Sequence, residues 1–232
     1  MGNKKKLVQF AELTSFSNVL EVGFDEVLHN DHPLKGKWHN KIFSNKGDIV
    51  LELGCGKGEY SVGMGKCYPE KNFIGVDIKG ARMWRGAKTA LEEGLNNVFF
   101  LRSRIDFISS FFEKGEISEI WLTFPDPQMR SSKERKRLTS DRFLDMYLSV
   151  LKPKGTINLK TDSDFLYEYS LEKARERGMA IQMAIPNIYA QIAELGLDKK
   201  EKEILAIRSH YERLFTAQGH MISFLRIASG GE

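Results

Sequence analysis

The stretch Ile49-Val-Leu-Glu-Leu-Gly-Cys-Gly-Lys-Gly-Glu-Tyr60 decides the fold of this chain. It begins with a short apolar run, interrupted by Glu52, of the kind that forms a buried parallel strand. Glycines then follow at every second position, Gly54, Gly56 and Gly58, before a helix-like segment. The stretch predicts a strand, a glycine turn and a helix. Glycine suits such a turn because a ligand lying on the backbone leaves no room for a Cβ atom, and because the turn often needs a positive φ.

The spacing of these glycines argues against two common nucleotide loops. A dinucleotide fingerprint needs its third glycine at position 59, where this chain has Glu59. A phosphate loop needs Ser or Thr after Gly-Lys, but Lys57 is followed by Gly58. Two distinctive features remain, which are Glu52 inside the strand and the alternating glycines.

A second acidic residue, Asp77, ends the next apolar run, Phe73-Ile-Gly-Val-Asp77, at about the spacing of twenty residues that a ribose ligand requires. With Glu52, this pattern resembles the S-adenosylmethionine loop of Rossmann-like methyltransferases. The resemblance implies that Glu52 lies near the positively charged methionine end of the cofactor and that Asp77 accepts hydrogen bonds from the ribose hydroxyls. A tight glycine turn in another kind of α/β protein is the alternative.

From the glycine loop onward, predicted strands alternate with predicted helices. Strands are expected at 49–53, 72–77, 97–101, 118–124, 155–160, 179–185 and 219–227, and helices at 58–67, 80–93, 104–113, 138–151, 163–177 and 200–214. This alternation predicts an α/β fold with a doubly wound, mostly parallel sheet. Ligand sites in such folds lie at the carboxyl ends of the strands.

The length of 232 residues suits one α/β domain with small additions, which we place at residues 46–232. Residues 1–45 show no sustained periodicity and mix lysines, among them Lys4, Lys5 and Lys6, with aromatic residues such as Phe10 and Trp38. We expect an extended, basic and aromatic N-terminal arm. It either contacts nucleic acid or is a solvated tail whose aromatic side chains pack on the domain.

Composition bounds the class of protein. The chain has 41% hydrophobic residues, a net charge of +4 and two cysteines, Cys55 and Cys67, in no metal-binding spacing. His29-Asn-Asp-His32 lacks a nearby third ligand, so we expect no metal. We expect no membrane-spanning segment or signal peptide, and a reducing, cytoplasmic location.

The loop after the fourth predicted strand carries the most informative chemistry. In Phe124-Pro-Asp-Pro127 two prolines hold Asp126 at the mouth of the sheet. Five cations follow within eight residues, opposed only by Glu134. They are Arg130, Lys133, Arg135, Lys136 and Arg137. This density favours a polyanion such as nucleic acid over a plain solvated surface.

At this point the chain resembles the bacterial tRNA (guanine-N7-)-methyltransferases over nearly its whole length. The resemblance rests on the glycine loop, Gly75-Val-Asp77 and the Phe124-Pro-Asp-Pro127 loop with its basic tail, and on two later elements, Leu159-Lys-Thr-Asp162 and Ser209-His-Tyr-Glu212. Gln128-Met129-Arg130 stands where the family commonly has Trp-Pro-Lys, and Arg104 stands where an acid or amide is common.

The resemblance implies a Rossmann-like class I methyltransferase that moves the methyl group of S-adenosylmethionine to N7 of guanine 46, in the variable loop of tRNA. We expect no metal and either a monomer or a homodimer. The implied site residues fall into four groups. They are the catalytic residue Asp126; the cofactor residues Glu52, Gly54, Gly56, Gly58, Asp77, Arg104 and Asp126; the substrate residues Arg130, Asp162, Ser209, Tyr211 and Glu212; and the RNA-backbone residues Lys133, Arg135, Lys136 and Arg137.

Guanine N7 carries a lone pair and no proton, so the expected mechanism is positioning and electrostatics without a general base. Two alternatives stay open. One is a methyltransferase acting on another RNA, a protein or a small molecule; the other is a non-catalytic RNA-binding subunit on a degenerate methyltransferase fold.

Overall fold

The structure is a computed structural model that describes residues 2–230, with side chains from residue 6 onward. Lys4 and Lys5 of the predicted arm therefore have side chains outside the described residues. The chain forms two compact units, residues 1–113 and 114–232. Among the described residues, every helix is too short or too polar to span a bilayer.

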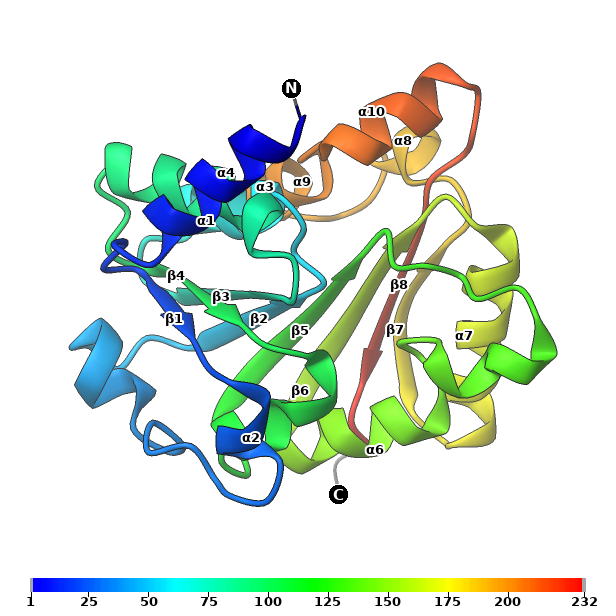
Figure 1. Cartoon of the computed structure of the whole chain (residues 1–232). Coiled ribbons are helices and arrows are strands. Elements are labelled where there is room, and N and C mark those ends of the chain that lie inside the picture. Colours follow the sequence, from blue (N-terminus) through cyan, green and yellow to red (C-terminus); the bar gives the residue numbers. More distant parts are fainter. Residues whose placement is uncertain (1, 231–232) are drawn as a thin grey trace. The chain divides into compact units, whose positions relative to one another are not determined.

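The first unit carries four strands in the order β1-β4-β3-β2, and all of its strand pairs are parallel (Figure 1). Its elements are α1 (Gly2–Leu13), β1 (Val19–Glu21), α2 (Phe24–Val27), the π-helix η1 (His39–Phe43), β2 (Ile49–Leu53), α3 (Glu59–Cys67), β3 (Asn72–Asp77), α4 (Gly80–Glu92), β4 (Val98–Arg102), the 3-10 helix η2 (Ile105–Phe107) and α5 (Ile108–Phe111). In β2, Ile49 lies beside Asn72 of β3, and in β3, Phe73 lies beside Val98 of β4. These registers bring the carboxyl ends of β2, β3 and β4 to one edge of the sheet.

The second unit carries four strands in the order β5-β6-β8-β7. Its elements are β5 (Ile117–Thr123), the 3-10 helix η3 (Ser131–Lys136), α6 (Asp141–Val150), β6 (Leu151–Thr161), α7 (Asp164–Glu176), β7 (Ala180–Ile185), α8 (Ile188–Gln191), α9 (Lys199–Leu205), α10 (His210–Ala217) and β8 (Ser223–Ala228). β5 and β6 are parallel, whereas β8 is antiparallel to both β6 and β7. The mostly parallel sheet predicted from the alternation of elements is confirmed.

Each unit has its own apolar core. Ile49, Ile74 and Phe100 are fully buried in the first unit, and Leu122 and Phe224 are fully buried in the second. Burying a side chain of this kind stabilises a fold by about 1.5–3 kcal/mol.

The prediction of an extended arm is wrong for residues 1–45. Residues 2–13 form α1, which packs on α4 in the first unit (Figure 1), and residues 19–21 form β1, which pairs with β4. Glu12 of α1 accepts a hydrogen bond from Trp84 Nε1 (2.9 Å) and pairs with Lys88 (2.8 Å) on α4. These tertiary contacts favour a helix that the sequence pattern does not signal. The domain boundary at residue 45 stays a prediction.

The other predicted elements from the glycine loop onward are confirmed, apart from shifts of a few residues at their ends and two regions. The predicted helix 104–113 is a short 3-10 turn followed by the single turn of α5. The predicted helix 200–214 divides into α9 and α10, because Ser209 begins a new helix as its N-cap.

Candidate functional site

The glycine loop leaves β2 at the carboxyl edge of the first unit. Gly54, Gly56 and Gly58 all have positive φ, of 82°, 55° and 72°. A Cβ atom on Gly58 would lie 2.6 Å from Phe100 Cε1, and one on Gly86 of α4 would lie 2.5 Å from the carbonyl oxygen of Lys57. The loop and α4 therefore pack backbone against backbone. This packing requires glycine at position 86, which the sequence analysis did not predict.

Gly54 and Gly56 face open space. A Cβ atom on Gly54 would have no neighbour within 4 Å, and one on Gly56 would meet only the carbonyl oxygen of Gly54, at 4.0 Å. Their positive φ, not a lack of room in the protein, selects glycine there. The half-buried backbone at Gly54 and Gly56 therefore leaves room for a ligand.

Asp77, at the end of β3, fixes the glycine loop. Its Oδ2 accepts a hydrogen bond from the Gly56 amide (2.9 Å), and its Oδ1 accepts one from the Lys79 amide (2.8 Å). The side chain is half-buried. The structure thus places Asp77 at the loop and gives it a structural role that the sequence did not reveal. Its contact with the ribose of the cofactor stays a prediction.

Glu52 lies inside β2, and its side chain is buried. The amide and the hydroxyl of Ser61 both donate to Glu52 Oε2, at 2.8 and 2.6 Å. Ser61 lies in the first turn of α3, where backbone amides lack partners within the helix and a negative charge is favourable. Glu52 therefore holds the start of α3 against β2, and its predicted position near the cofactor stays a prediction.

Cys55 lies between these two carboxylates. Burial raises the pKa of the Cys55 thiol, and the charges of Glu52 and Asp77 raise it further. The thiolate is therefore disfavoured, and Cys55 is a poor nucleophile.

Arg104 follows β4 and precedes η2. Its Nε and Nη2 donate to Asp106 Oδ2 at 3.3 Å, and half of its side chain is exposed. Arg104 therefore forms an ion pair with Asp106, two residues further along the chain. The predicted contact of Arg104 with the cofactor stays a prediction.

In the second unit, Asp126 is exposed in the loop after β5. Two residues of this loop that are not glycine have positive φ, Phe124 at 51° and Gln128 at 47°. The Gln128 amide donates to Asp126 Oδ1 (2.9 Å), and the Phe124 amide donates to the carbonyl oxygen of Lys160 on β6 (2.8 Å). Backbone strain of this kind costs on the order of 1–3 kcal/mol per residue and is most often found at functional sites.

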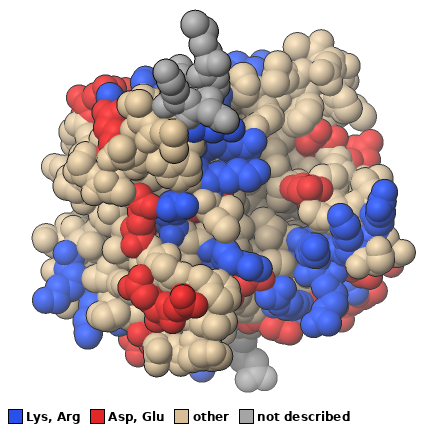
Figure 2. Space-filling model, in the orientation of Figure 1, with Lys and Arg blue, Asp and Glu red and all other residues tan. Residues whose placement is uncertain are grey.

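Four of the five predicted cations after this loop are exposed. They are Arg130, Lys133, Arg135 and Lys136. Figure 2 shows Lys and Arg side chains gathered over the segment that follows β5, at the right of the view. We call these four residues the basic segment. Its side chains are exposed to solvent, and their contact with RNA stays a prediction.

Arg137 differs from the basic segment because only 5% of its surface is exposed. Its guanidinium lies 4.7 Å from the ring centre of Phe165 and 4.4 Å from that of Tyr169. Its Nε and Nη2 both donate to the carbonyl oxygen of Gln128 at 3.3 Å. The prediction that Arg137 contacts the RNA backbone is therefore corrected, since its side chain faces into the second unit.

Two elements named in the sequence analysis meet at a buried ion pair. Lys160 Nζ lies 2.7 Å from Glu212 Oε1, and both side chains are fully buried. Lys160 also donates to the carbonyl oxygen of Leu205 (2.7 Å) and to Tyr189 Oη (3.0 Å), and Tyr189 in turn donates to Glu212. Desolvation lowers the pKa of Lys160 to about 8, although Glu212 opposes this shift.

The remaining substrate residues lie around this pair. Ser209 and Glu212 form a capping box at the start of α10, since each side chain binds the backbone amide of the other. Tyr211 is exposed, and Asp162 is half-buried just beyond β6. Tyr211 and Asp162 are therefore accessible to a substrate, whereas the Glu212 carboxylate is engaged inside the unit.

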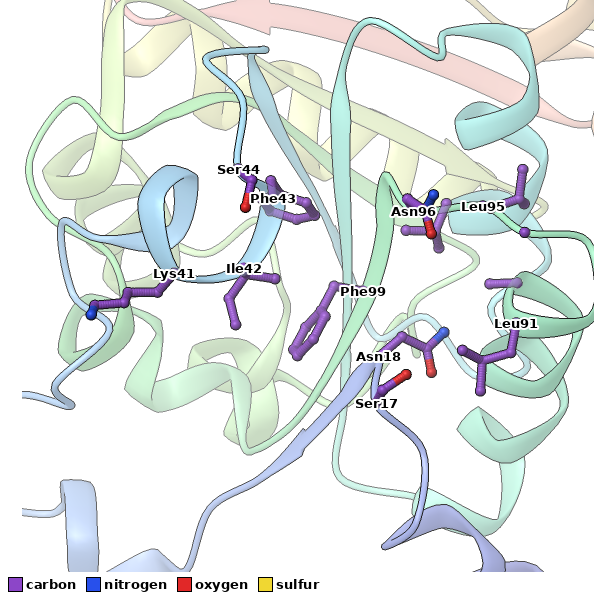
Figure 3. Close-up of a pocket in the computed structure, with 13 residues that line it drawn as sticks. Ser17, Asn18, Lys41, Ile42, Phe43, Ser44, Leu91, Leu95, Asn96 and Phe99 are labelled. Carbon is purple, nitrogen blue, oxygen red and sulfur yellow. The ribbon is translucent and has the colours of Figure 1, made fainter.

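A separate cavity of about 430 Å³ lies in the first unit, next to the amino end of β4 (Figure 3). Asn18, Phe43, Asn96 and Phe99 are among its lining residues. It contains none of the predicted site residues, and it touches the end of β4 opposite to that from which Arg104 follows. The described residues also contain no group of three or more His, Cys, Asp or Glu side chains placed to hold a metal ion.

Solved structures with the same fold are methyltransferases. The 16S rRNA methyltransferase KamB matches 85% of this chain and 94% of its own, with a TM-score of 0.61 at 14% identity. The 16S rRNA (adenine(1408)-N(1))-methyltransferase from Catenulisporales acidiphilia matches 85% and 92%, with a TM-score of 0.58 at 14% identity. The fold, with its glycine loop and following acid, is that of a Rossmann-like class I methyltransferase, as predicted.

The sequence comparisons are more specific. A family model described as "Putative methyltransferase" matches residues 46–225. The tRNA (guanine-N(7)-)-methyltransferase of Christiangramia forsetii is 46% identical over 226 residues, which cover 97% of this chain and 98% of the relative. The protein of the same name from Porphyromonas gingivalis is 50% identical over 220 residues, 94% and 87% of the two chains. The chain belongs to the tRNA (guanine-N(7)-)-methyltransferase family, and the predicted family and enzyme class are confirmed.

Proposed function

We propose that this protein transfers the methyl group of S-adenosylmethionine to N7 of guanine 46 in the variable loop of tRNA. The observation that carries the proposal is the match to relatives named tRNA (guanine-N(7)-)-methyltransferase along almost the whole chain. The exposed Asp126 loop with its adjoining basic segment supports it, because this is the part of the chain that distinguishes an RNA substrate from a small one.

The glycine loop fits S-adenosylmethionine. The open backbone at Gly54 and Gly56 admits a ligand, and Asp77 provides a carboxylate at the same loop for the ribose hydroxyls. Glu52 adds negative charge behind the loop, which favours a cationic ligand. When bound, S-adenosylmethionine supplies an electrophilic methyl group on a sulfonium.

The residues of this chain need not remove a proton from the substrate. Guanine N7 has a free lone pair, so the bond to the methyl carbon forms while the carbon–sulfur bond breaks, and the guanine ring becomes cationic. Cys55 is unsuited to a covalent step, because burial raises its pKa. Catalysis then comes from placing N7 and from stabilising the positive charge.

Asp126 and Asp162 are the groups that we assign to the guanine. Each carboxylate can accept hydrogen bonds from the N1–H and N2–H groups of the base, and each opposes the charge that builds on the ring. Arg130 and Tyr211 are exposed and complete the proposed substrate contacts. Reaching N7 in a folded tRNA requires the base to leave its stack.

Glu212 and Ser209 act on the substrate only indirectly in this proposal. Their side chains are used to start α10 and to bind Lys160, so they hold Tyr211 in place. The basic segment binds the phosphates that flank the target guanine.

The test is transfer of a radiolabelled methyl group from S-adenosylmethionine to bulk tRNA, followed by nucleoside analysis. We expect 7-methylguanosine as the labelled nucleoside, and mapping by chemical cleavage at that nucleoside should place it at guanine 46. Label in a different nucleoside or in another class of RNA would refute the proposal, and so would binding of tRNA without any transfer.

A further inference from the structure

Arg137 ends the run of cations after the Asp126 loop, but it is built into the second unit. Phe165 and Tyr169 lie one turn apart on α7 with nearly parallel rings, 18° between planes and 6.5 Å between centres. The guanidinium lies within 5 Å of each ring centre. A planar, always charged group is well suited to such an aromatic site, and a lysine ammonium is not equivalent.

The same guanidinium binds the backbone of the Asp126 loop. Both Nε and Nη2 donate to the carbonyl oxygen of Gln128, and the amide of Gln128 donates to Asp126 Oδ1. Gln128 has a φ of 47°, a conformation that a residue with a side chain adopts only when its surroundings impose it. Gln128 therefore links the two side chains, because its carbonyl oxygen binds Arg137 and its amide binds the Asp126 carboxylate.

We propose that Arg137 is a positioning residue for methyl transfer, which fixes Gln128 in its left-handed conformation and thereby orients the Asp126 carboxylate. This inference rests on the proposed function of Asp126. It assigns α7 a part in the reaction as well, because Phe165 and Tyr169 determine where the guanidinium lies.

A phosphate contact is the competing role for Arg137. Lys133, Arg135 and Lys136 are exposed, whereas Arg137 is buried. Arg137 also has an ionic partner within the protein, since its Nη1 lies 3.9 Å from Glu134 Oε1. An arginine held in this way has its donors directed at the protein, so removal of its charge should leave phosphate binding unchanged.

Two variants of Arg137 separate the roles. Arg137→Lys keeps the charge but loses the planar group, and Arg137→Met loses both. We expect single-turnover methylation of tRNA to fall by about ten- to a hundredfold in each, as a small misplacement of a catalytic group does. The log-log salt dependence of tRNA binding should stay that of the parent, whereas an arginine that bound a phosphate would, once replaced by methionine, reduce the slope by about 0.7–0.9.

Arg226→Lys is the matched control. Arg226 lies on β8, is largely buried, and donates to Asn158 and Glu201, away from the Asp126 loop. It should lower the stability of the fold to a similar extent and leave the single-turnover rate unchanged. A fall in rate with Arg226→Lys equal to that with Arg137→Lys would mean that general destabilisation explains both, and would overturn the proposal.

A double-variant comparison tests the path through Asp126. In an Asp126→Asn background, Arg137→Lys should change the rate by less than about twofold, because residues that act as a unit are not additive. A full additional loss there would overturn the proposal, and so would a parental rate in Arg137→Lys alone.

Amide hydrogen exchange makes the test independent of the reaction. Exchange in peptides covering residues 124–130 should be faster in Arg137→Lys than in the parent and in Arg226→Lys. If the parent protein fails to methylate tRNA, the proposed function is wrong while this measurement still tests the contact. Unchanged exchange in Arg137→Lys would refute the positioning role whatever the substrate.

Discussion

Asp126 is an exposed carboxylate between two residues, Phe124 and Gln128, that have left-handed backbone conformations. The Gln128 amide already binds one carboxylate oxygen, so Asp126 is oriented before a substrate arrives. A charge fixed in this way costs little reorganisation when positive charge develops on the guanine.

Asp126→Asn should therefore remove mainly transition-state stabilisation. We expect turnover to fall about a hundred- to a thousandfold, which corresponds to roughly 2.7–4 kcal/mol. Affinity for tRNA should change little, because it comes mostly from phosphates. Single-turnover methylation and a tRNA binding titration measure the two effects. A rate near that of the parent would move the catalytic role to Asp162.

Asp77 has two roles in the proposal, since it holds the glycine loop through Gly56 and binds the cofactor. Asp77→Ala should weaken S-adenosylmethionine binding by about 1.5–3 kcal/mol, as the loss of a charged hydrogen bond does. Calorimetry measures this affinity, and thermal unfolding shows whether the variant is folded. An unchanged affinity in a folded variant would remove Asp77 from the cofactor site.

The sequence identified the residues at the strand ends but not the direction of every side chain. Asp77 ends an apolar strand and Asp126 follows one, so their position at the carboxyl ends of strands could be predicted. Arg137 and Glu212 could not be placed, because charge and spacing do not show whether a side chain faces solvent. Their partners, Tyr169 and Lys160, lie over thirty residues away along the chain.

At the scale of elements, β6 and α10 are joined by the Lys160–Glu212 pair. The backbone carbonyl of Lys160 also holds Phe124, at the start of the Asp126 loop. The ring of Phe124 lies 6.4 Å from that of Phe215 on α10. β6 and α10 therefore hold the loop at Phe124, while Arg137 holds it at Gln128.

Lys160→Met should destabilise the fold by about 3–5 kcal/mol, because it leaves the Glu212 carboxylate buried without its cation. The double variant Lys160→Met, Glu212→Gln should be more stable than Lys160→Met alone, since no uncompensated charge is left. Denaturant unfolding of the three proteins measures these differences. If the single and double variants were equally unstable, the ion pair would not be the cause.

The lowered pKa of Lys160 predicts how stability depends on pH. Between about pH 8 and 10 the buried amine releases its proton, whereas in the unfolded chain it keeps that proton until its ordinary value of 10.5. The unfolded state then binds more protons, so stability rises with pH in this window. The full effect of this shift is about 3 kcal/mol.

The charged and titratable groups that face Lys160 are Glu212, Tyr189 and Arg208. Burial raises the pKa of Tyr189, so above pH 10 the unfolded state loses the tyrosine proton first and stability falls again. The measurement is the unfolding free energy of the parent minus that of Lys160→Met, Glu212→Gln from pH 7 to 10. A difference that does not rise above pH 8 would contradict the assignment.

Periodicity predicted the elements that bury a regular apolar face and missed those that do not. α1 was missed because only Leu13 is fully buried among its residues from 6 onward, while Leu7 and Val8 are exposed. Its hydrogen bond and ion pair with α4 come from Glu12, a polar residue that adds nothing to an apolar periodicity. The break between α9 and α10 was missed because Ser209 is an N-cap inside an otherwise helical composition.

At the scale of the whole molecule, a modest net charge of +4 conceals a local concentration of cations in the basic segment. Lys133→Ala with Lys136→Ala should lower tRNA affinity and flatten its log-log salt dependence by about one unit for each phosphate that is no longer bound. Affinity for S-adenosylmethionine should not change. Filter binding at several salt concentrations measures the slope.

Lys114→Ala with Lys154→Ala is the matched control for this pair. Both lysines are exposed and lie before β5 and in the first part of β6, at the other end of these strands from the Asp126 loop. They should leave the salt slope unchanged. Equal slopes for both double variants would show that charge anywhere on the surface has the same effect, and that the basic segment is a solvated face.

The α/β class could be predicted for the molecule as a whole because predicted strands alternate with predicted helices along the chain. The antiparallel pairing of β8 with β6 and β7 could not, since pairing direction leaves no mark on an apolar run. The division into units at residue 113 also escaped the sequence analysis, because no loop rich in glycine or proline marks it.

In the sequence, the five cations between residues 130 and 137 are equivalent, since each adds the same charge. In the structure they are not equivalent, because the side chain of Arg137 is buried. We expect exchange of lysine for arginine to have little effect at the exposed positions and a large effect at position 137, where the side chain is buried. If residues 124–137 were grafted onto another scaffold without Phe165 and Tyr169, we expect the graft to bind RNA but to lose the orientation of the Asp126 carboxylate.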